Sequence, residues 1–256
     1  MPLHYSYADG VGRMTFDFPE KKNALDQAAR KEMERIVTQV RDDERVRALL
    51  ITGTGGAFCA GGDINTFAGS TPTAMRDRMK QQHRVTQMLY DLEKPVIAAV
   101  AGPAFGVGFN IALLADVILA APSARFCQAY ARVAIVPDGG GLYLLSRVVG
   151  TQRAKAMFMT AQVIGAQEAQ NMGIVHAIHE EAALEAEASA LATRLAEGPT
   201  RAFGLGKAML NRGMDCDFAT YLEIEATAEA FIMQTEDHRE AVTSFKEKRK
   251  PRFSGT

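Results

Sequence analysis

An uncharged stretch, residues 95–115, constrains the fold of this chain more than any other feature. It is long enough to cross a membrane as one helix, but Gly102, Pro103, Gly106 and Gly108 interrupt its middle. We therefore interpret it as a buried strand, a glycine-rich loop and a buried helix. The sequence predicts that this segment lies inside a protein core, and no membrane association is expected.

The segments around this stretch alternate between strand and helix patterns. Apolar and polar side chains alternate at residues 14–18, as in a half-buried strand, and Asp26 can cap the helix that follows. Such alternation favours crossover connections and predicts an α/β fold with a layered core. The later strands are expected at residues 46–52, 96–100, 117–120 and 174–178, with helices at about residues 75–92 and 108–114.

From about residue 180 onward, strand patterns disappear and helical patterns dominate. We expect a core that spans residues 1–195 and a helical region that spans residues 196–256. The tail from Phe245 to Lys250 is basic. It suits either a solvated helix end, which the helix dipole favours, or a phosphate-binding role.

Composition excludes several classes of protein. The 29 basic and 30 acidic residues give a formal net charge of -1, so the chain as a whole does not attract nucleic acid. Its three cysteines are odd in number and widely spaced, which predicts neither a disulfide framework nor a CxxC metal site. The histidines form no metal-ligand motif, and the N-terminus lacks a signal peptide pattern. We expect a cytoplasmic protein without a metal.

Two loops rich in small residues follow predicted strands, at residues 52–64 and 101–110. Glycine allows the backbone to approach a ligand closely. Neither loop matches the Walker A or the GxGxxG phosphate-binding motif. The second loop runs into the uncharged helix, where free amide groups favour an oxyanion. The loops alone support oxyanion binding and close core packing equally.

The loops and three other segments resemble the enoyl-CoA hydratase/isomerase, or crotonase, superfamily. The resemblance covers essentially the whole chain and implies a crotonase-like spiral of ββα units with a C-terminal helical appendage that forms trimers or dimers of trimers. It also implies an acyl-CoA thioester as substrate, so that coenzyme A enters with the substrate and no separate cofactor is expected. The similar segments, in the family's order, are Asn23-Ala24-Leu25, residues 58–64, 94–100 and 102–108, and the tail at residues 245–249.

The resemblance also implies roles for individual residues. In the family, one amide from each loop forms an oxyanion hole, which implies Ala60 and Val107 here. Val107 replaces a commoner glycine, and its amide can donate if this β-branched residue adopts the required φ and ψ. Each such donor is worth about 3 kcal/mol. The residues implied to bind coenzyme A are Ala24, Gly62, Asp63 and Ile64, joined by Phe245 and Lys248 from a neighbouring subunit.

The family's hydratases use two glutamates, and this chain has neither. Asn110 and Tyr130 stand at those positions, where they could orient the substrate, so the carboxylate pair that activates water is missing. Asp138 lies in a Pro-Asp-Gly-Gly turn and either caps the next helix or, by similarity to isomerase members, acts as the catalytic acid and base. One carboxylate suffices to shift a double bond. We predict a Δ3,Δ2-enoyl-CoA isomerase-like activity, or isomerisation of a related cyclic acyl-CoA.

Several alternatives remain open at this point. The chain could be a hydratase that uses Asp138, or a thioester hydrolase or dehalogenase with a carboxylate nucleophile. It could also be a catalytically reduced protein that only binds coenzyme A or serves an interaction. RNA binding would require a basic stripe, which the even charge balance does not predict.

Overall fold

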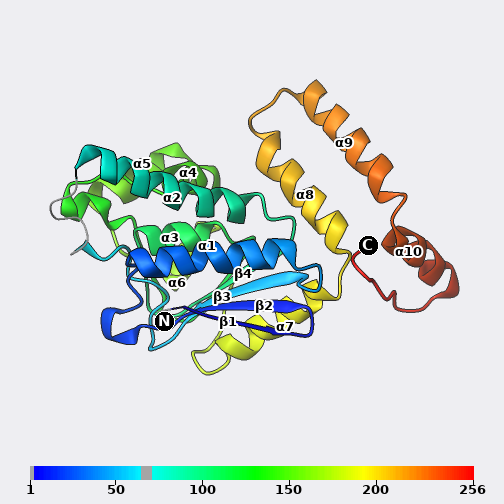
Figure 1. Cartoon of the computed structure of the whole chain (residues 1–256), viewed down its shortest axis with the longest axis horizontal. Helices are drawn as coiled ribbons and strands as arrows, with labels where there is room; N and C mark the ends of the chain where they lie inside the picture. The colour runs from blue at the N-terminus through cyan, green and yellow to red at the C-terminus, as the bar shows by residue number, and fades with distance from the viewer. Residues whose placement is uncertain (1–2, 65–70) are drawn as a thin grey trace.

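A six-stranded sheet forms the centre of the computed structural model, which describes residues 3–64 and 71–256 (Figure 1). Its strands, given in spatial order, are β1 (Leu3–Ala8), β2 (Val11–Phe16), β3 (Ala48–Gly53), β4 (Val96–Val100), β6 (Val117–Ala120) and β9 (Ala177–Ile178). Strands β1 and β2 form an antiparallel hairpin, and every other pair is parallel. Parallel pairs need crossover connections. Helices supply them: α1 (Gln27–Asp42), α2 (Pro72–Tyr90) and α3 (Val107–Leu113).

Helices cover both faces of the sheet. On one face α1 contributes Met33 and Ile36 to the main core, and on the other α7 (Leu184–Ala196) packs against Leu50 and Ile97. Burial on both faces explains why β4 and the first four residues of β3 are continuously apolar. The interpretation of residues 95–115 as strand, loop and helix is confirmed for the strand and the helix, whereas the predicted loop contains a short strand at Pro103–Phe105. No described helix has the length and apolar character needed to span a membrane.

A second, three-stranded sheet carries the loop that precedes α3. Its strands pair in the order β5 (Pro103–Phe105), β7 (Arg125–Cys127) and β8 (Ile164–Gly165). The other described helical elements of the core are η1 (Pro19–Lys21), η3 (Ala129–Val133), α4 (Gly141–Val149), α5 (Thr151–Thr160) and α6 (Ala166–Asn171). The sequence did not predict this second sheet, because strands of two or three residues leave no readable alternation.

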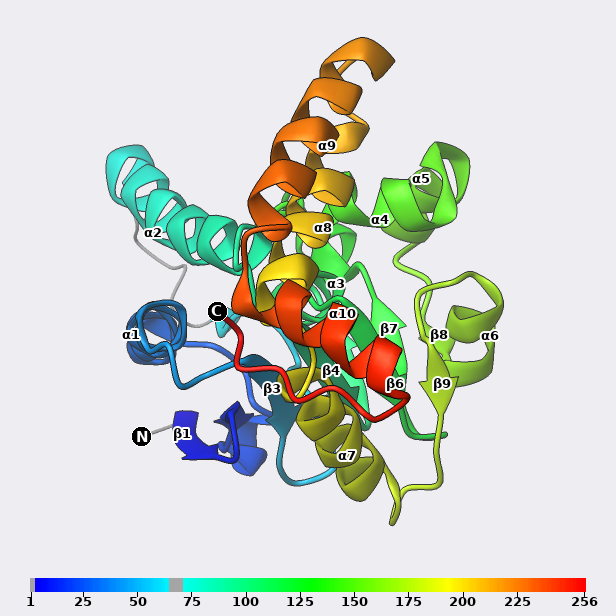
Figure 2. The same ribbon diagram turned by 90° about the vertical axis from the view of Figure 1, so that its right-hand side faces the viewer.

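The C-terminal part is helical, as predicted, and consists of α8 (Thr200–Gly213), α9 (Phe218–Ile232) and α10 (Glu236–Glu247). These helices lie at the opposite end of the molecule from α4 and α5 (Figure 1), and α8 and α9 run side by side away from the sheet (Figure 2). The predicted division between residues 195 and 196 falls at the end of α7. A trimerisation role for residues 196–256 stays a prediction.

The start of α1 follows its predicted chemistry. The side chain of Asp26 caps the helix by accepting a hydrogen bond from the amide of Ala29, at 2.7 Å. This helix carries six buried residues on one face: Ala29, Arg30, Met33, Ile36, Val37 and Val40. One of them, Arg30, lines a cavity.

Candidate active site

A cavity of about 190 Å³ opens where the two glycine-rich loops meet. It joins residues from both loops to residues from α1 and from the segment that follows β7. Its lining residues include Arg30, Ala60, Gly62, Ile64, Val107, Tyr130, Arg132 and Asp138. The structure therefore brings the predicted oxyanion loops and the predicted catalytic aspartate together.

The two loops are held against each other by very close backbone packing. A Cβ atom on Gly108 would lie less than 3.0 Å from the carbonyl oxygen of Cys59, so only glycine fits there. Two hydrogen bonds close the same contact: the Cys59 amide donates to Pro103 O at 3.0 Å, and the Phe105 amide donates to Cys59 O at 2.9 Å. The relative position of the two loops is thereby fixed.

The structure corrects the first predicted oxyanion donor. The amide of Ala60 donates to the carbonyl oxygen of Lys22 at 2.9 Å, so it is already engaged. Gly62 forms a parallel bridge with Leu25 in which the bonds are made by the amides of Leu25 and Asp63. Among the described residues the Gly62 amide has no acceptor, and Gly62 lines the cavity. Of these two amides, that of Gly62 and not that of Ala60 is therefore available to a ligand in the cavity.

The second predicted donor, Val107, has a suitable backbone. Gly106 takes the unusual conformation, with φ 52° and ψ -121°, which glycine tolerates readily. Val107 then begins α3 with helical geometry, where a β-branched residue is not strained. As the first residue of the helix, its amide has no intrahelical acceptor. Its amide is therefore available, and the side chain does not prevent donation.

Asp138 is positioned by a chain of buried hydrogen bonds. The hydroxyl of Tyr130 donates to Asp138 Oδ1 at 2.6 Å, and Asn110 Nδ2 donates to Tyr130 Oη at 2.7 Å. Gln128 Nε2 in turn donates to Asn110 Oδ1 at 2.9 Å. The alternative that Asp138 caps the next helix is wrong, because α4 follows Gly140 and has no side-chain cap.

Tyr130 stays protonated in this arrangement. Burial raises the pKa of its hydroxyl, and the nearby charge of Asp138 raises it further. The neutral hydroxyl is a hydrogen-bond donor and holds one carboxylate oxygen in place. Asp138 Oδ2 accepts no bond from any residue in the described ranges. One carboxylate oxygen is thus held by the tyrosine, and the other is available to a ligand in the cavity.

The other predicted coenzyme A contacts are more scattered. Ile64 lines the cavity and is 58% exposed, whereas Asp63 is buried and pairs with Lys21 at 3.0 Å. Phe245 and Lys248, at the end of α10, do not line the cavity, and α10 lies at the far end of the molecule (Figure 1). Ala24 lies beside the first loop, outside the residues that line the cavity.

Sequence reasoning missed three polar residues at this site. Arg30 and Arg132 line the cavity, and Gln128 supports Asn110 from behind. A signal for Arg30 was present, because it lies at helical spacing from Met33 and Val37 on the apolar face of α1. No comparable signal marked the other two.

Loss of the tyrosine hydroxyl tests this network. We expect Tyr130→Phe to lower kcat roughly tenfold, because Asp138 loses a hydrogen bond to its charged form. Stability should fall by about 1 kcal/mol, since Asn110 loses one acceptor. Tyr143 is a matched control, because its hydroxyl also donates to an aspartate, Asp215, at 2.6 Å, and neither residue lines the cavity. Steady-state kinetics in which Tyr130→Phe resembles Tyr143→Phe would contradict this role.

Residues 6–256 match the family model described as enoyl-CoA hydratase/isomerase. The chain belongs to the enoyl-CoA hydratase/isomerase family. Family members that are named for different activities are similar to this chain in sequence. The short-chain-enoyl-CoA hydratase of Clostridium acetobutylicum is 38% identical over 241 residues, covering 94% of this chain and 92% of the relative. The 1,2-epoxyphenylacetyl-CoA isomerase of Escherichia coli is 33% identical over 250 residues, covering 96% and 95%.

Solved structures of family members have the same fold. The crystal structure of an enoyl-CoA hydratase/isomerase from Cupriavidus metallidurans matches with a TM-score of 0.94 at 37% identity, covering 99% of this chain and 96% of that one. The predicted crotonase-like α/β fold with a helical C-terminal part is therefore confirmed. The protein is an enzyme of the crotonase superfamily.

Proposed function

We propose that this enzyme shifts a double bond in an enoyl-CoA thioester, with Asp138 as the only catalytic acid and base. One observation carries the proposal: within the described residues, Asp138 is the single carboxylate that lines the cavity. The positions of the two family glutamates hold Asn110 and Tyr130, which serve to orient Asp138 through hydrogen bonds. A site with one carboxylate suits proton transfer better than the addition of water.

The reaction follows from this geometry. The thioester oxygen accepts hydrogen bonds from the amides of Gly62 and Val107, which stabilise the enolate that forms when a proton leaves C2. Asp138 Oδ2 takes that proton and returns it to C4, so the double bond moves from C3 to C2 without net consumption of water. Two amide donors contribute roughly 3 kcal/mol each to the transition state, and a positioned base contributes about 10² to 10⁴ in rate.

The products formed from paired substrates test this proposal. The enzyme is incubated with 3-enoyl-CoA and with 2-enoyl-CoA of several chain lengths, and the isomers, 3-hydroxyacyl-CoA and free coenzyme A are separated. We expect interconversion of the two enoyl isomers as the fastest reaction. Faster formation of 3-hydroxyacyl-CoA would favour a hydratase that uses Asp138. Faster release of free coenzyme A would favour a hydrolase.

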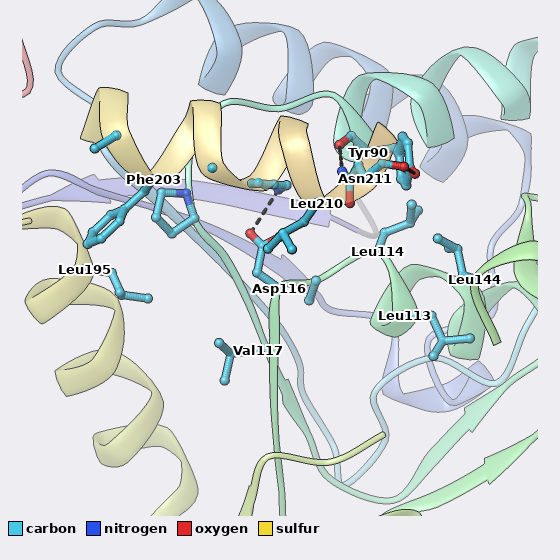
Figure 3. Close-up of a pocket in the computed structure, with 15 residues that line it drawn as sticks. Tyr90, Leu113, Leu114, Asp116, Val117, Leu144, Leu195, Phe203, Leu210 and Asn211 are labelled. Carbon is cyan, nitrogen blue, oxygen red and sulfur yellow. Dashed lines mark hydrogen bonds and ion pairs between the residues drawn. The ribbon is translucent and has the colours of Figure 1, made fainter. Parts of the chain in front are cut away.

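We also propose that the enzyme forms a homotrimer or a dimer of trimers through its C-terminal helices. Helix α9 buries none of its residues within the chain. A pocket of about 550 Å³ lies between α8 and the core, and Figure 3 shows Leu114, Leu144 and Leu210 around it. Exposed apolar surface of this kind is typical of a subunit interface. The same contact would carry Phe245 and Lys248 towards a neighbouring active site.

A charge at this surface should disrupt the assembly. Leu210 is 75% exposed and lines the pocket, so Leu210→Asp is expected to leave the fold intact in a single subunit. Burying an unpaired carboxylate in an interface costs several kcal/mol, which should dissociate the oligomer. Light scattering after size exclusion should report a lower mass for Leu210→Asp than for the matched Leu210→Met. Equal masses for both variants would contradict this interface.

A further inference from the structure

A buried arginine lines the active-site cavity and has no role in the proposed proton transfer. Arg30 is only 2% exposed and shares the cavity with Asp138 and Tyr130. Its Nη1 donates to Oε1 of Gln82, a neutral group, whereas its Nε has no hydrogen-bond partner in residues 3–64 and 71–256. Burying a guanidinium costs several kcal/mol unless an anion compensates it.

No carboxylate of the described residues forms an ion pair with Arg30, because no carboxylate oxygen among them lies within 4.0 Å of its guanidinium nitrogens. Asp138 is the carboxylate that shares its cavity, but its Oδ1 accepts a hydrogen bond from Tyr130 and not from Arg30. Arg30 therefore offers donor groups to whatever enters the cavity.

A second arginine, Arg132, also lines the cavity, and its Nη2 donates to the carbonyl oxygen of Ala161 at 2.9 Å, which is not an anion. The pKa of Arg78 on α2 is lowered, first by burial and next by the charge of Arg30, while the charges of Asp138 and Asp63 oppose this shift. Arg132 is exposed to solvent, so the buried Arg30 is the cation that a neutral hydrocarbon chain would leave without an anion.

We propose that the acyl group of the substrate carries its own carboxylate, which binds the Arg30 guanidinium. This inference rests on the proposed acyl-CoA chemistry and specifies its substrate class as a monothioester of a dicarboxylic acid. The planar guanidinium fork matches a carboxylate in two-bond geometry, and such bonds between charged groups are the strong ones. The thioester oxygen then lies at Gly62 and Val107, and the distal carboxylate lies at Arg30.

The volume of the cavity limits the length of this acyl group. About 190 Å³ is available. At about 30 Å³ for each non-hydrogen atom, the share of a water molecule in the liquid, roughly six atoms fit. The acyl group is accordingly short, with a chain of about four or five carbons that includes the thioester carbonyl carbon and the carboxylate carbon.

Binding of two saturated thioesters tests the inference without requiring a reaction. Glutaryl-CoA ends in a carboxylate, and valeryl-CoA has the same chain length with a methyl end. By titration calorimetry we expect the wild-type enzyme to bind glutaryl-CoA at least about tenfold more tightly. Arg30→Met should reduce this preference to about threefold or less, and Arg30→Lys should keep part of it. Gln82→Met, which keeps the arginine charge, should retain the preference.

The outcomes separate this inference from the proposed function. Equal binding of both thioesters by the wild-type enzyme, or an unchanged preference in a folded Arg30→Met variant, overturns the carboxylate assignment. If Arg30→Met does not fold, as judged by thermal melting, the wild-type and Arg30→Lys titrations still decide. Isomerisation of a neutral 3-enoyl-CoA by an enzyme without the binding preference would leave the proposed function standing and reject only the inference. Failure of the wild type to bind either thioester rejects both.

Discussion

Replacing Asp138 with asparagine is expected to lower kcat by about 10² to 10⁴, the usual contribution of a positioned general base. Asparagine has nearly the same size, and its side-chain oxygen can still accept the Tyr130 hydroxyl that now donates at 2.6 Å. The oxyanion amides and the cavity remain. Substrate binding should therefore change little, and the loss should fall on kcat in steady-state kinetics.

A second Asp→Asn variant controls for the chemical change. Asp9 is exposed in the turn between β1 and β2 and has φ 49°, a conformation that asparagine tolerates well. Asp9→Asn should retain the wild-type kcat. If Asp138→Asn also retains it while its melting temperature is unchanged, Asp138 is not the base, and the proposed isomerase mechanism fails.

Gly108→Ala should damage both activity and stability. The new Cβ would lie less than 3.0 Å from the carbonyl oxygen of Cys59, which is backbone and cannot rotate away. The loops must separate, at a cost of about 1 to 3 kcal/mol for overpacking. Separation also moves the amides of Gly62 and Val107 apart. Since one such donor is worth about 10² to 10³ in kcat, we expect a loss of that order.

Gly165→Ala separates this steric effect from the general cost of replacing glycine. Gly165 has φ -86° and ψ 174°, which alanine can adopt, and its added Cβ would meet only Arg125 Nη1 at 3.9 Å. We expect normal kcat and a loss of less than about 1 kcal/mol. Chemical denaturation and kinetics should be measured on both variants. Equal behaviour of Gly108→Ala and Gly165→Ala would show that close loop packing is unimportant.

The long elements of the fold could be predicted because their patterns are local. The bounds of β4 and β6 agree with the expected residues 96–100 and 117–120, where uncharged apolar runs end at turn residues. The β1–β2 hairpin was missed, although Asp9-Gly10 is a two-residue turn signal with positive φ at both positions. Strands β5, β7 and β8 form because distant segments pair, as Phe105 does with Cys127.

The candidate site was predictable in its residue types and less so in its detailed contacts. Both loops and Asp138 were identified from the sequence and share one cavity. The donor in the first loop was misassigned because the acceptor that engages Ala60 is the carbonyl of Lys22, distant in the sequence. The bond between Tyr130 and Asp138 likewise depends on how η3 and the following turn fold back on each other. Such contacts are tertiary, and no local pattern contains them.

In the proposed mechanism, one carboxylate moves a proton between carbons without adding water. The most direct test of this step is the mass spectrum of the products formed from a 3-enoyl-CoA in water enriched with ¹⁸O. We expect the main product to be 2-enoyl-CoA with an unchanged mass. A labelled 3-hydroxyacyl-CoA as the main product would contradict it, and so would free coenzyme A with a labelled carboxylic acid.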